Sequence, residues 1–144
     1  MKLVICEKPS VGAAGAAARG VTGKKDGYIE NDKYIISWCI GHLVQLSEAA
    51  AYGEQYRKWS YDSLPILPQE WQYTVAADKG KQFKILKDLM HRADVSEVVN
   101  ACDAGREGEL IFDLSMKWRA ARNPLPVFGF PLWKRTQFEA ALNI

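Results

Sequence analysis

Acidic residues at two distant places in the sequence are the strongest candidates for chemistry. Glu7 directly follows an apolar run at residues 2–6, and residues 103–109 hold three carboxylates, Asp103, Glu107 and Glu109. Clustered carboxylates repel one another, so a nearby cation is needed to keep them ionised together. Mg²⁺ takes oxygen ligands and usually retains waters and substrate phosphates. The two features therefore indicate a magnesium site that is open to a phosphate-bearing substrate.

The elements around these acids are expected to bring them together. Residues 2–6 and 97–102 are short apolar runs that predict buried strands of a parallel sheet. Ligands of open α/β sheets bind beyond the carboxyl ends of the strands, so Glu7 and Asp103 are expected on one edge. Acids at a helix start more often only stabilise the helix, and the prediction of a site therefore depends on the combination.

The rest of the chain predicts alternating strands and helices. Further elements are expected at residues 9–19 (helix), 28–30 and 34–38 (hairpin), 72–76 (strand), 78–92 (helix), 107–118 (helix), 127–133 (strand) and 136–142 (helix). Asp78 is expected to cap its helix, and Leu110, Ile111, Leu114 and Trp118 are expected to share a buried face. Residues 41–68 show little periodicity. This order predicts one α/β domain, residues 1–144, with a mostly parallel sheet flanked by helices.

Composition excludes several classes of protein. Hydrophobic residues make up 48% of the 144 residues, and the formal net charge is only +2, which by itself makes no case for DNA binding. The three cysteines have no C-x-x-C spacing, which argues against a disulfide framework or a zinc site and favours the reducing cytoplasm. No run of residues has the features of a signal peptide or a membrane span.

Two motifs resemble the type IA DNA topoisomerases. Residues 6–11 read C-E-K-P-S-V, which is similar to the opening E-K-P-S motif of that family. Residues 103–111 read D-A-G-R-E-G-E-L-I, which is similar to the acidic region of its topoisomerase III-like members. Residues 41–43 and 58–68 also look like that subfamily. The resemblance covers residues 1 to about 115, and two separated motifs in the correct order make it specific.

The resemblance implies a Toprim fold, a Rossmann-like sheet with flanking helices, and a role in cleaving and rejoining single-stranded DNA. It implies a site with Glu7, Lys8 and Arg106 as catalytic residues and with Mg²⁺ held by Glu7, Asp103 and Glu107. Glu7 would assist proton transfer, and Lys8 would contact the DNA phosphate as a point charge. Arg106 would be a phosphate or structural partner, also touching the nucleic acid.

One departure from the family pattern and one absence bear on these expectations. Gly105 stands where the family has a second Asp, which leaves the metal site with one carboxylate fewer. None of the six tyrosines lies in a motif that matches the nucleophilic tyrosine of these enzymes. The resemblance therefore implies that residues 1–144 are the N-terminal domain of a longer topoisomerase, which works with the remaining domains of the same chain.

Two other functions remain open from the sequence. A stand-alone Toprim nuclease would use the same acids to activate water, and a non-catalytic module would only bind DNA or a partner. Fold alone does not choose among these possibilities. His42 resembles a family position near the cleft, but a histidine in such a place is more often structural.

Overall fold

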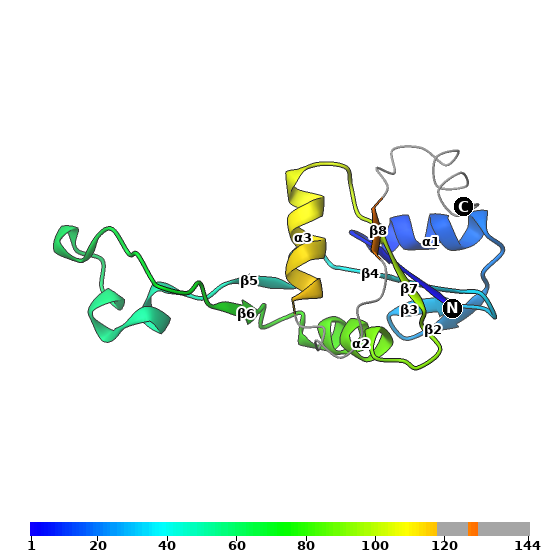
Figure 1. Ribbon diagram of the computed structural model, residues 1–144, viewed down its shortest axis with the longest axis horizontal. Coiled ribbons are helices and arrows are strands. Elements are labelled where there is room, and N and C mark those ends of the chain that lie inside the picture. The colour runs from blue at the N-terminus through cyan, green and yellow to red at the C-terminus, as the bar shows by residue number, and fades with distance from the viewer. Residues whose placement is uncertain (118–126, 130–144) are drawn as a thin grey trace.

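A six-stranded sheet forms the centre of the molecule. The computed structural model describes residues 1–117 and 127–129 (Figure 1). The strands follow the order β2-β3-β4-β1-β7-β8. Their bounds are β1 Lys2–Cys6, β2 Gly23–Lys25, β3 Tyr28–Glu30, β4 Tyr34–Trp38, β7 Glu97–Ala101 and β8 Val127–Gly129.

The middle of the sheet is parallel, as the sequence predicts. Strand β1 pairs in parallel with β4 on one side and β7 on the other, and β7 pairs in parallel with β8. Residues 3–6 of β1 are completely buried. Because both faces of a central parallel strand are covered, a continuous apolar run suits β1 better than an alternating one.

Two antiparallel strands extend one edge of the sheet. Strand β3 pairs with β4 across a turn in which Asn31 Oδ1 accepts hydrogen bonds from the backbone N–H groups of Lys33 and Tyr34. The predicted hairpin is thus confirmed. Strand β2 pairs with β3 on the outside, in a stretch for which no strand is expected from the sequence.

Three helices cover the sheet, and they divide its core into two layers. Helix α1 (Pro9–Ala18) packs over Val4, Cys6 and Ile36, whereas α2 (Gly80–Met90) and α3 (Arg106–Met116) pack over Leu3 and Ile5. The alternation along β1 follows from the two-residue period of a strand. The mostly parallel α/β sheet with flanking helices is therefore confirmed.

Some local predictions were wrong. Asp78 does not cap α2, because that helix begins at Gly80 after Lys79 and has no side-chain cap. Leu110 is 46% exposed and does not share the buried face of α3 formed by Ile111 and Leu114. Trp118, residues 130–133 of the expected last strand and the expected helix at 136–142 lie outside the described residues.

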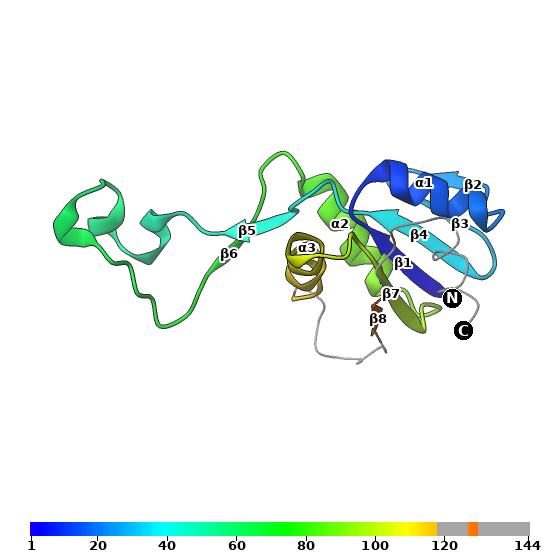
Figure 2. The ribbon, with the colours of Figure 1, turned by 90° about the horizontal axis from the view of Figure 1, so that it is seen from above.

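A long excursion leaves the body between β4 and α2. Strands β5 (Val44–Leu46) and β6 (Tyr73–Val75) form a separate two-stranded antiparallel sheet, and β6 confirms the strand expected at residues 72–76. Beyond them the chain makes three short 3-10 helices, Ala49–Tyr52, Glu54–Tyr56 and Tyr61–Ser63. Residues 44–76, called the arm below, project away from the sheet and its helices (Figures 1 and 2). In the described ranges, no helix is long and apolar enough to cross a bilayer.

Candidate active site

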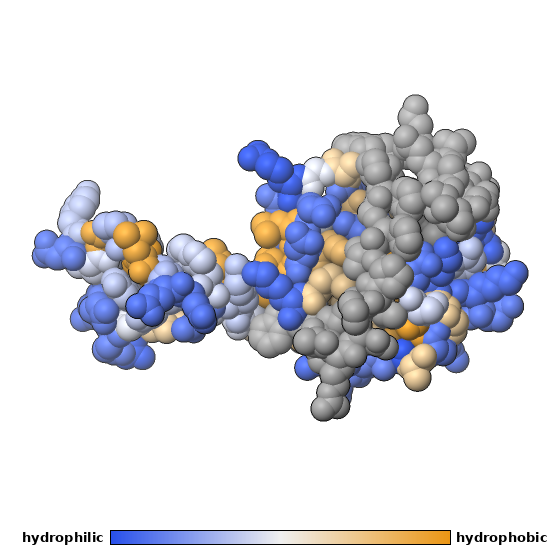
Figure 3. Space-filling model, in the orientation of Figure 1, coloured by the Kyte–Doolittle hydropathy of each residue, from blue (hydrophilic) through white to orange (hydrophobic). Residues whose placement is uncertain are grey.

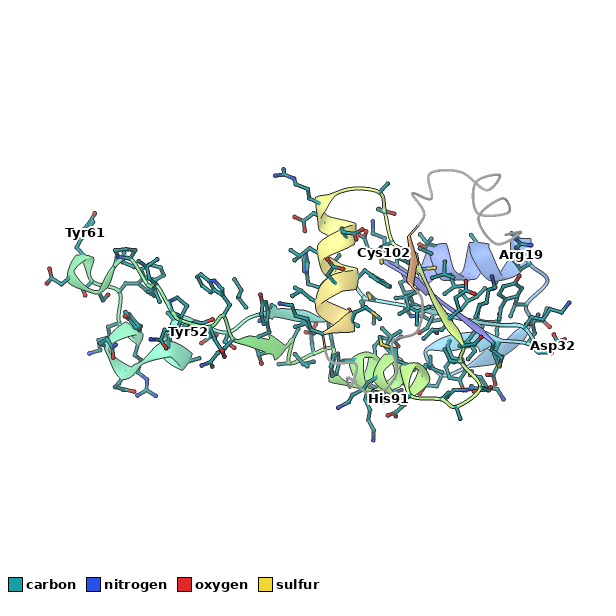
Figure 4. The ribbon with its side chains drawn as sticks, viewed as in Figure 1. Arg19, Asp32, Tyr52, Tyr61, His91 and Cys102 are labelled. Carbon is teal, nitrogen blue, oxygen red and sulfur yellow. The ribbon has the colours of Figure 1, made fainter. Side chains whose placement is uncertain are left out.

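The acids predicted to meet lie at the carboxyl ends of neighbouring strands. Glu7 follows β1, and Asp103 lies two residues beyond β7, with Cys6 and Ala101 paired in register between the two strands. The amino end of α3 begins beside them at Arg106. Figure 4 labels Cys102, the residue before Asp103, at this edge. We call this edge, with Glu7, Lys8, Asp103, Arg106 and Glu107, the acidic rim.

The Lys8 ammonium group lies between two of the carboxylates. Lys8 Nζ is 3.4 Å from Glu7 Oε1 and 3.7 Å from Asp103 Oδ2. The Glu7 side chain is 12% exposed, while that of Lys8 is 57% exposed. Solvent-exposed ion pairs contribute at most about 1 kcal/mol to stability. The arrangement therefore matters more for the electrostatics of the rim than for holding the fold together.

The third acid, Glu107, is held by a histidine from a different part of the chain. His42 Nε2 lies 2.9 Å from Glu107 Oε2, and the His42 carbonyl oxygen accepts a hydrogen bond of 3.1 Å from Lys79 Nζ. His42 follows Gly41, whose φ of 64° is in the left-handed region that favours glycine. The sequence favours a purely structural role for His42. The structure adds to that prediction, because the His42 side chain reaches the rim and contacts Glu107.

Asn100 is a second residue at the rim that the sequence did not single out. Its side chain is buried; Nδ2 donates a hydrogen bond of 3.3 Å to Glu109 Oε2, and Oδ1 accepts one of 3.0 Å from the Cys102 N–H. Asn100 thus joins the end of β7 to the first turn of α3. The sequence does contain a signal for this role, because Asn100 is a polar residue inside the apolar run at 97–102. A buried polar side chain needs hydrogen-bond partners, so such a residue indicates a contact with another element.

Gly108 lets α3 pack against the turn that carries Asp103. A Cβ atom at position 108 would collide with the Asp103 carbonyl oxygen and lie 2.9 Å from the carbonyl carbon and the amide nitrogen of Asp103. At Gly105, by contrast, a Cβ would meet nothing within 4 Å, and the backbone there is extended. Position 105 could therefore carry a side chain, whereas position 108 could not.

The donor set at the rim suits a hard cation. Carboxylate oxygens are what Mg²⁺ binds, and partly exposed acids leave room for waters and a phosphate. Glu7 and Asp103 already share a cationic partner in Lys8, which demonstrates that both face one point. In residues 1–117 and 127–129, however, no three His, Cys, Asp or Glu side chains are close enough to form a metal site, and Glu107 is turned toward His42.

Arg106 is exposed at the first position of α3 and forms no ion pair within the described part of the chain. The sequence predicts that it contacts phosphate together with Lys8. Both cations lie at the rim, and a helix amino end adds partial positive charge there. An anionic substrate would therefore meet positive groups and carboxylates at one place.

Three free, buried thiols lie behind the rim. Cys6 ends β1, and Cys39 and Cys102 directly follow β4 and β7. Burial raises the pKa of Cys6 to about 12. The hydrogen bond between Cys39 and Cys102 raises the pKa of Cys102 and lowers that of Cys39, and burial adds to the increase at Cys102. Cys6 and Cys102 are protonated at neutral pH and act as core residues rather than as nucleophiles.

No tyrosine lies at the rim. All six tyrosines are in the described part of the chain; Tyr28 packs against the core, Tyr34 lies under Arg19, and the ring of Tyr73 lies under Lys117. The other three, Tyr52, Tyr56 and Tyr61, are on the arm, where Figure 4 labels Tyr52 and Tyr61. The chain thus has no phenol positioned to attack a phosphate bound between Glu7 and Asp103.

Comparison with known proteins decides the family. The Toprim domain family matches residues 2–122. The chain belongs to the Toprim domain family. This assignment agrees with the parallel sheet and with acids placed at the ends of its strands.

Several curated relatives are called DNA topoisomerase 3. This Toprim domain is 45% identical to the proteins from Staphylococcus haemolyticus and Bacillus anthracis, and 44% identical to that from Bacillus licheniformis. Each match covers 109 residues, which is 76% of this chain but only 15% of the relative. The resemblance to topoisomerase III-like sequences is therefore confirmed for this part of the relatives.

A solved structure supports the fold. This Toprim domain superposes on full-length topoisomerase I from Thermotoga maritima with a TM-score of 0.62 at 16% sequence identity. The superposition covers 98% of this chain and 20% of that protein. At this level of identity the similarity concerns the fold alone.

Proposed function

We propose that this chain is the Toprim part of a type IA, topoisomerase III-like DNA topoisomerase. In this role it binds Mg²⁺ and supplies acid–base and phosphate-positioning groups for cleaving and rejoining single-stranded DNA. One observation carries the proposal: Glu7 and Asp103, almost a hundred residues apart, face the same Lys8 ammonium group at the ends of adjacent strands. The similarity to DNA topoisomerase 3 relatives supports it.

Glu7 is the proposed proton-transfer group. Its carboxylate is mostly shielded from water, yet it lies against the cation that would meet the substrate. In its protonated form this carboxyl group would give a proton to the leaving sugar oxygen, and the resulting carboxylate would take that proton back when the strand is rejoined.

Lys8 and Arg106 are the proposed phosphate-binding groups. Lys8 presents a compact charge to one phosphate oxygen, whereas the planar guanidinium of Arg106 can bind two oxygens at once. Because Lys8 is 57% exposed, its ammonium group can turn from the carboxylates toward an incoming phosphodiester. These contacts would hold single-stranded DNA at the rim.

Glu7, Asp103 and Glu107 are the residues that would hold the ion. When bound, Mg²⁺ would offset the charge of the phosphodiester and orient it. His42 holds Glu107 through its hydrogen bond, and Asn100 anchors Glu109 nearby. These two neighbours fix where the acids of α3 lie relative to β1.

The nucleophile is proposed to be a tyrosine from outside this sequence, in the remaining part of the topoisomerase. The free, buried state of all three thiols suits work in the reducing cytoplasm, where we place the enzyme. The second candidate is a stand-alone metal-dependent nuclease, which the lack of a tyrosine at the rim favours. Nicking of plasmid DNA by the isolated chain in the presence of Mg²⁺ would support that candidate.

Substitution of Glu7 tests the proposal. We define the grafted topoisomerase as S. haemolyticus DNA topoisomerase 3 in which this chain replaces the stretch that it matches. Glu7→Gln keeps the shape of the side chain but removes its proton-transfer function, which typically contributes about 100-fold or more to a rate. We therefore expect relaxation of supercoiled DNA by the grafted topoisomerase to fall by about that factor, with an unchanged unfolding transition.

Glu97→Gln is the matched control. Glu97 lies at the opposite end of β7 from Asp103, where it pairs with Lys2. This variant should relax DNA at the parent rate. Equal rates for the parent and the Glu7→Gln variant would refute the role of Glu7.

A further inference from the structure

The arm has no core of its own. Within residues 45–75 no side chain is buried, and none of the three 3-10 helices has a buried residue. A few contacts hold it together, chiefly those of Tyr52. The Tyr52 hydroxyl accepts a hydrogen bond from the Gln72 N–H and donates one to the Gln72 carbonyl oxygen, and its ring packs edge-on against Trp71. A structured excursion of this length in a compact domain is usually functional.

Large apolar side chains on the arm face solvent. Tyr61 is 96% exposed, Trp59 82% and Leu67 79%, and Leu46, Leu64 and Trp71 are also exposed. Figure 3 shows apolar residues gathered on the visible face of the arm. The arm also carries a groove of about 540 Å³, lined in part by Tyr52, Tyr56 and Leu67. Exposed aromatic residues beside a groove are typical of protein–protein interfaces.

The charge of the arm argues against DNA as its partner. Residues 44–76 contain four carboxylates but only two basic side chains, Arg57 and Lys58, and Arg57 is paired with Glu54 at 2.7 Å. Proteins that stack bases on aromatic rings combine them with a positively charged groove. Net negative charge would repel the phosphate backbone, so a protein surface is the better occupant.

The similarity to DNA topoisomerase 3 relatives indicates which protein could supply the partner surface of the arm. A match of 109 residues within a chain of 144 must include residues 36–109, and the arm therefore lies inside the part shared with the DNA topoisomerase 3 relatives. In those relatives this part makes up only 15% of the polypeptide. We therefore look for the partner surface in the other 85% of such an enzyme.

We infer that the arm is a docking element for the rest of the topoisomerase polypeptide. Trp59, Tyr61 and Leu67 enter an apolar surface of that polypeptide, and basic residues around that surface meet the acids of the arm. The inference rests on the proposed function, because it takes its partner from the topoisomerase III-like enzyme. It assigns the arm to assembly, and it leaves the chemistry to the acidic rim.

Limited proteolysis without DNA or Mg²⁺ tests the inference. Chymotrypsin should cut the isolated chain readily after Trp59 and Tyr61, whereas in the grafted topoisomerase these cuts should be at least about tenfold slower. Replacing Trp59 and Leu67 together with Ser should restore cutting after Tyr61 in the graft to the rate of the isolated chain. Tryptic cutting after Lys33, in the hairpin turn at the other end of the molecule near Asp32 (Figure 4), is the internal control.

Equal cutting of the arm in the graft and in the isolated chain would overturn the inference. A dimer of the isolated chain in sedimentation that Trp59→Ser abolishes would also overturn it and would make a second copy the partner. Protection that requires added single-stranded DNA would overturn it in favour of DNA. Because the digestion needs no catalysis, it is repeated with the Glu7→Gln graft, so that failure of the docking and failure of the proposed chemistry give different results.

Discussion

At the scale of single residues, Lys8 controls the charge of the rim. It neutralises part of the repulsion between Glu7 and Asp103, and it lies where a divalent ion would otherwise be needed. In the proposed site, a metal ion and the lysine would thus be alternative partners of the same two acids. The third acid, Glu107, is hydrogen-bonded to His42 in this structure. Gly105 leaves open space in which a further carboxylate could act.

Gly105→Asp is expected to strengthen the metal site. Position 105 is the N-cap of α3, its backbone is extended, and a Cβ there meets nothing within 4 Å. An added carboxylate near the ion should tighten Mg²⁺ binding by about tenfold, which corresponds to about 1.4 kcal/mol. Gly105→Asn is the control, because it caps the helix equally well without adding charge. Calorimetric titration with Mg²⁺ that gives the same affinity for both variants would contradict the prediction.

The residues that the sequence identifies at the rim are those that follow strand ends. Glu7 and Asp103 could be placed because parallel strands end on one edge, whatever their separation in the chain. His42 and Asn100 could not be assigned their partners. Their hydrogen bonds to Glu107 and Glu109 depend on where the loop after β4 and the first turn of α3 meet in space. The spacing of residues along the chain does not contain that information.

At the scale of elements, the close packing of α3 on the turn before it holds the acids in place. Asn100 ties β7 to the first turn of α3, and the missing side chain at Gly108 lets that turn lie against the Asp103 backbone. The neighbours of Gly108 are backbone atoms, which cannot rotate away as a side chain could.

Gly108→Ala is expected to destabilise the domain by about 1–3 kcal/mol, the usual cost of overpacking. A glycine inside a helix would otherwise gain up to about 1 kcal/mol on replacement by alanine, so the sign of the effect is diagnostic. Gly80→Ala is the matched control, because Gly80 begins α2 and a Cβ there meets nothing within 4 Å. Urea unfolding should show a loss for Gly108→Ala and no loss for Gly80→Ala; equal stability of the two variants would contradict this account.

Long apolar elements were predictable from the sequence, and short polar ones were not. Strands β1 and β7 read directly as apolar runs, whereas β2 and β5 have only three residues each and few buried side chains. Strand β5 pairs with β6, which lies far along the chain. Strand β2 pairs with the nearby β3, and only the Asp-Gly turn at residues 26 and 27 signals that pairing in the sequence. Leu110 fitted the helical period of the buried face but lies on its solvent side, since the period alone does not mark where that face ends.

At the scale of the whole molecule, the chain consists of a Toprim body and an arm, to which we assign different tasks. The body gathers acids and cations at one edge, and the arm presents apolar side chains away from it (Figures 1 and 3). The rim has no tyrosine, and the apolar side chains of the arm are exposed. Both features suit a domain that functions in contact with other domains of an enzyme. The sheet was predictable from the sequence, but the projection of the arm was not, because residues 41–68 lack any periodicity that indicates packing.

The central claim is that Glu7 and Asp103 bind one divalent ion together, and Mn²⁺ titration of the chain by NMR tests it most directly. Mn²⁺ takes oxygen ligands as Mg²⁺ does and broadens the signals of nearby amides. The account predicts selective broadening at residues 7, 8 and 103–108, which Glu7→Gln combined with Asp103→Asn abolishes. Broadening only at the acids of the arm, or no selective broadening at all, would contradict it.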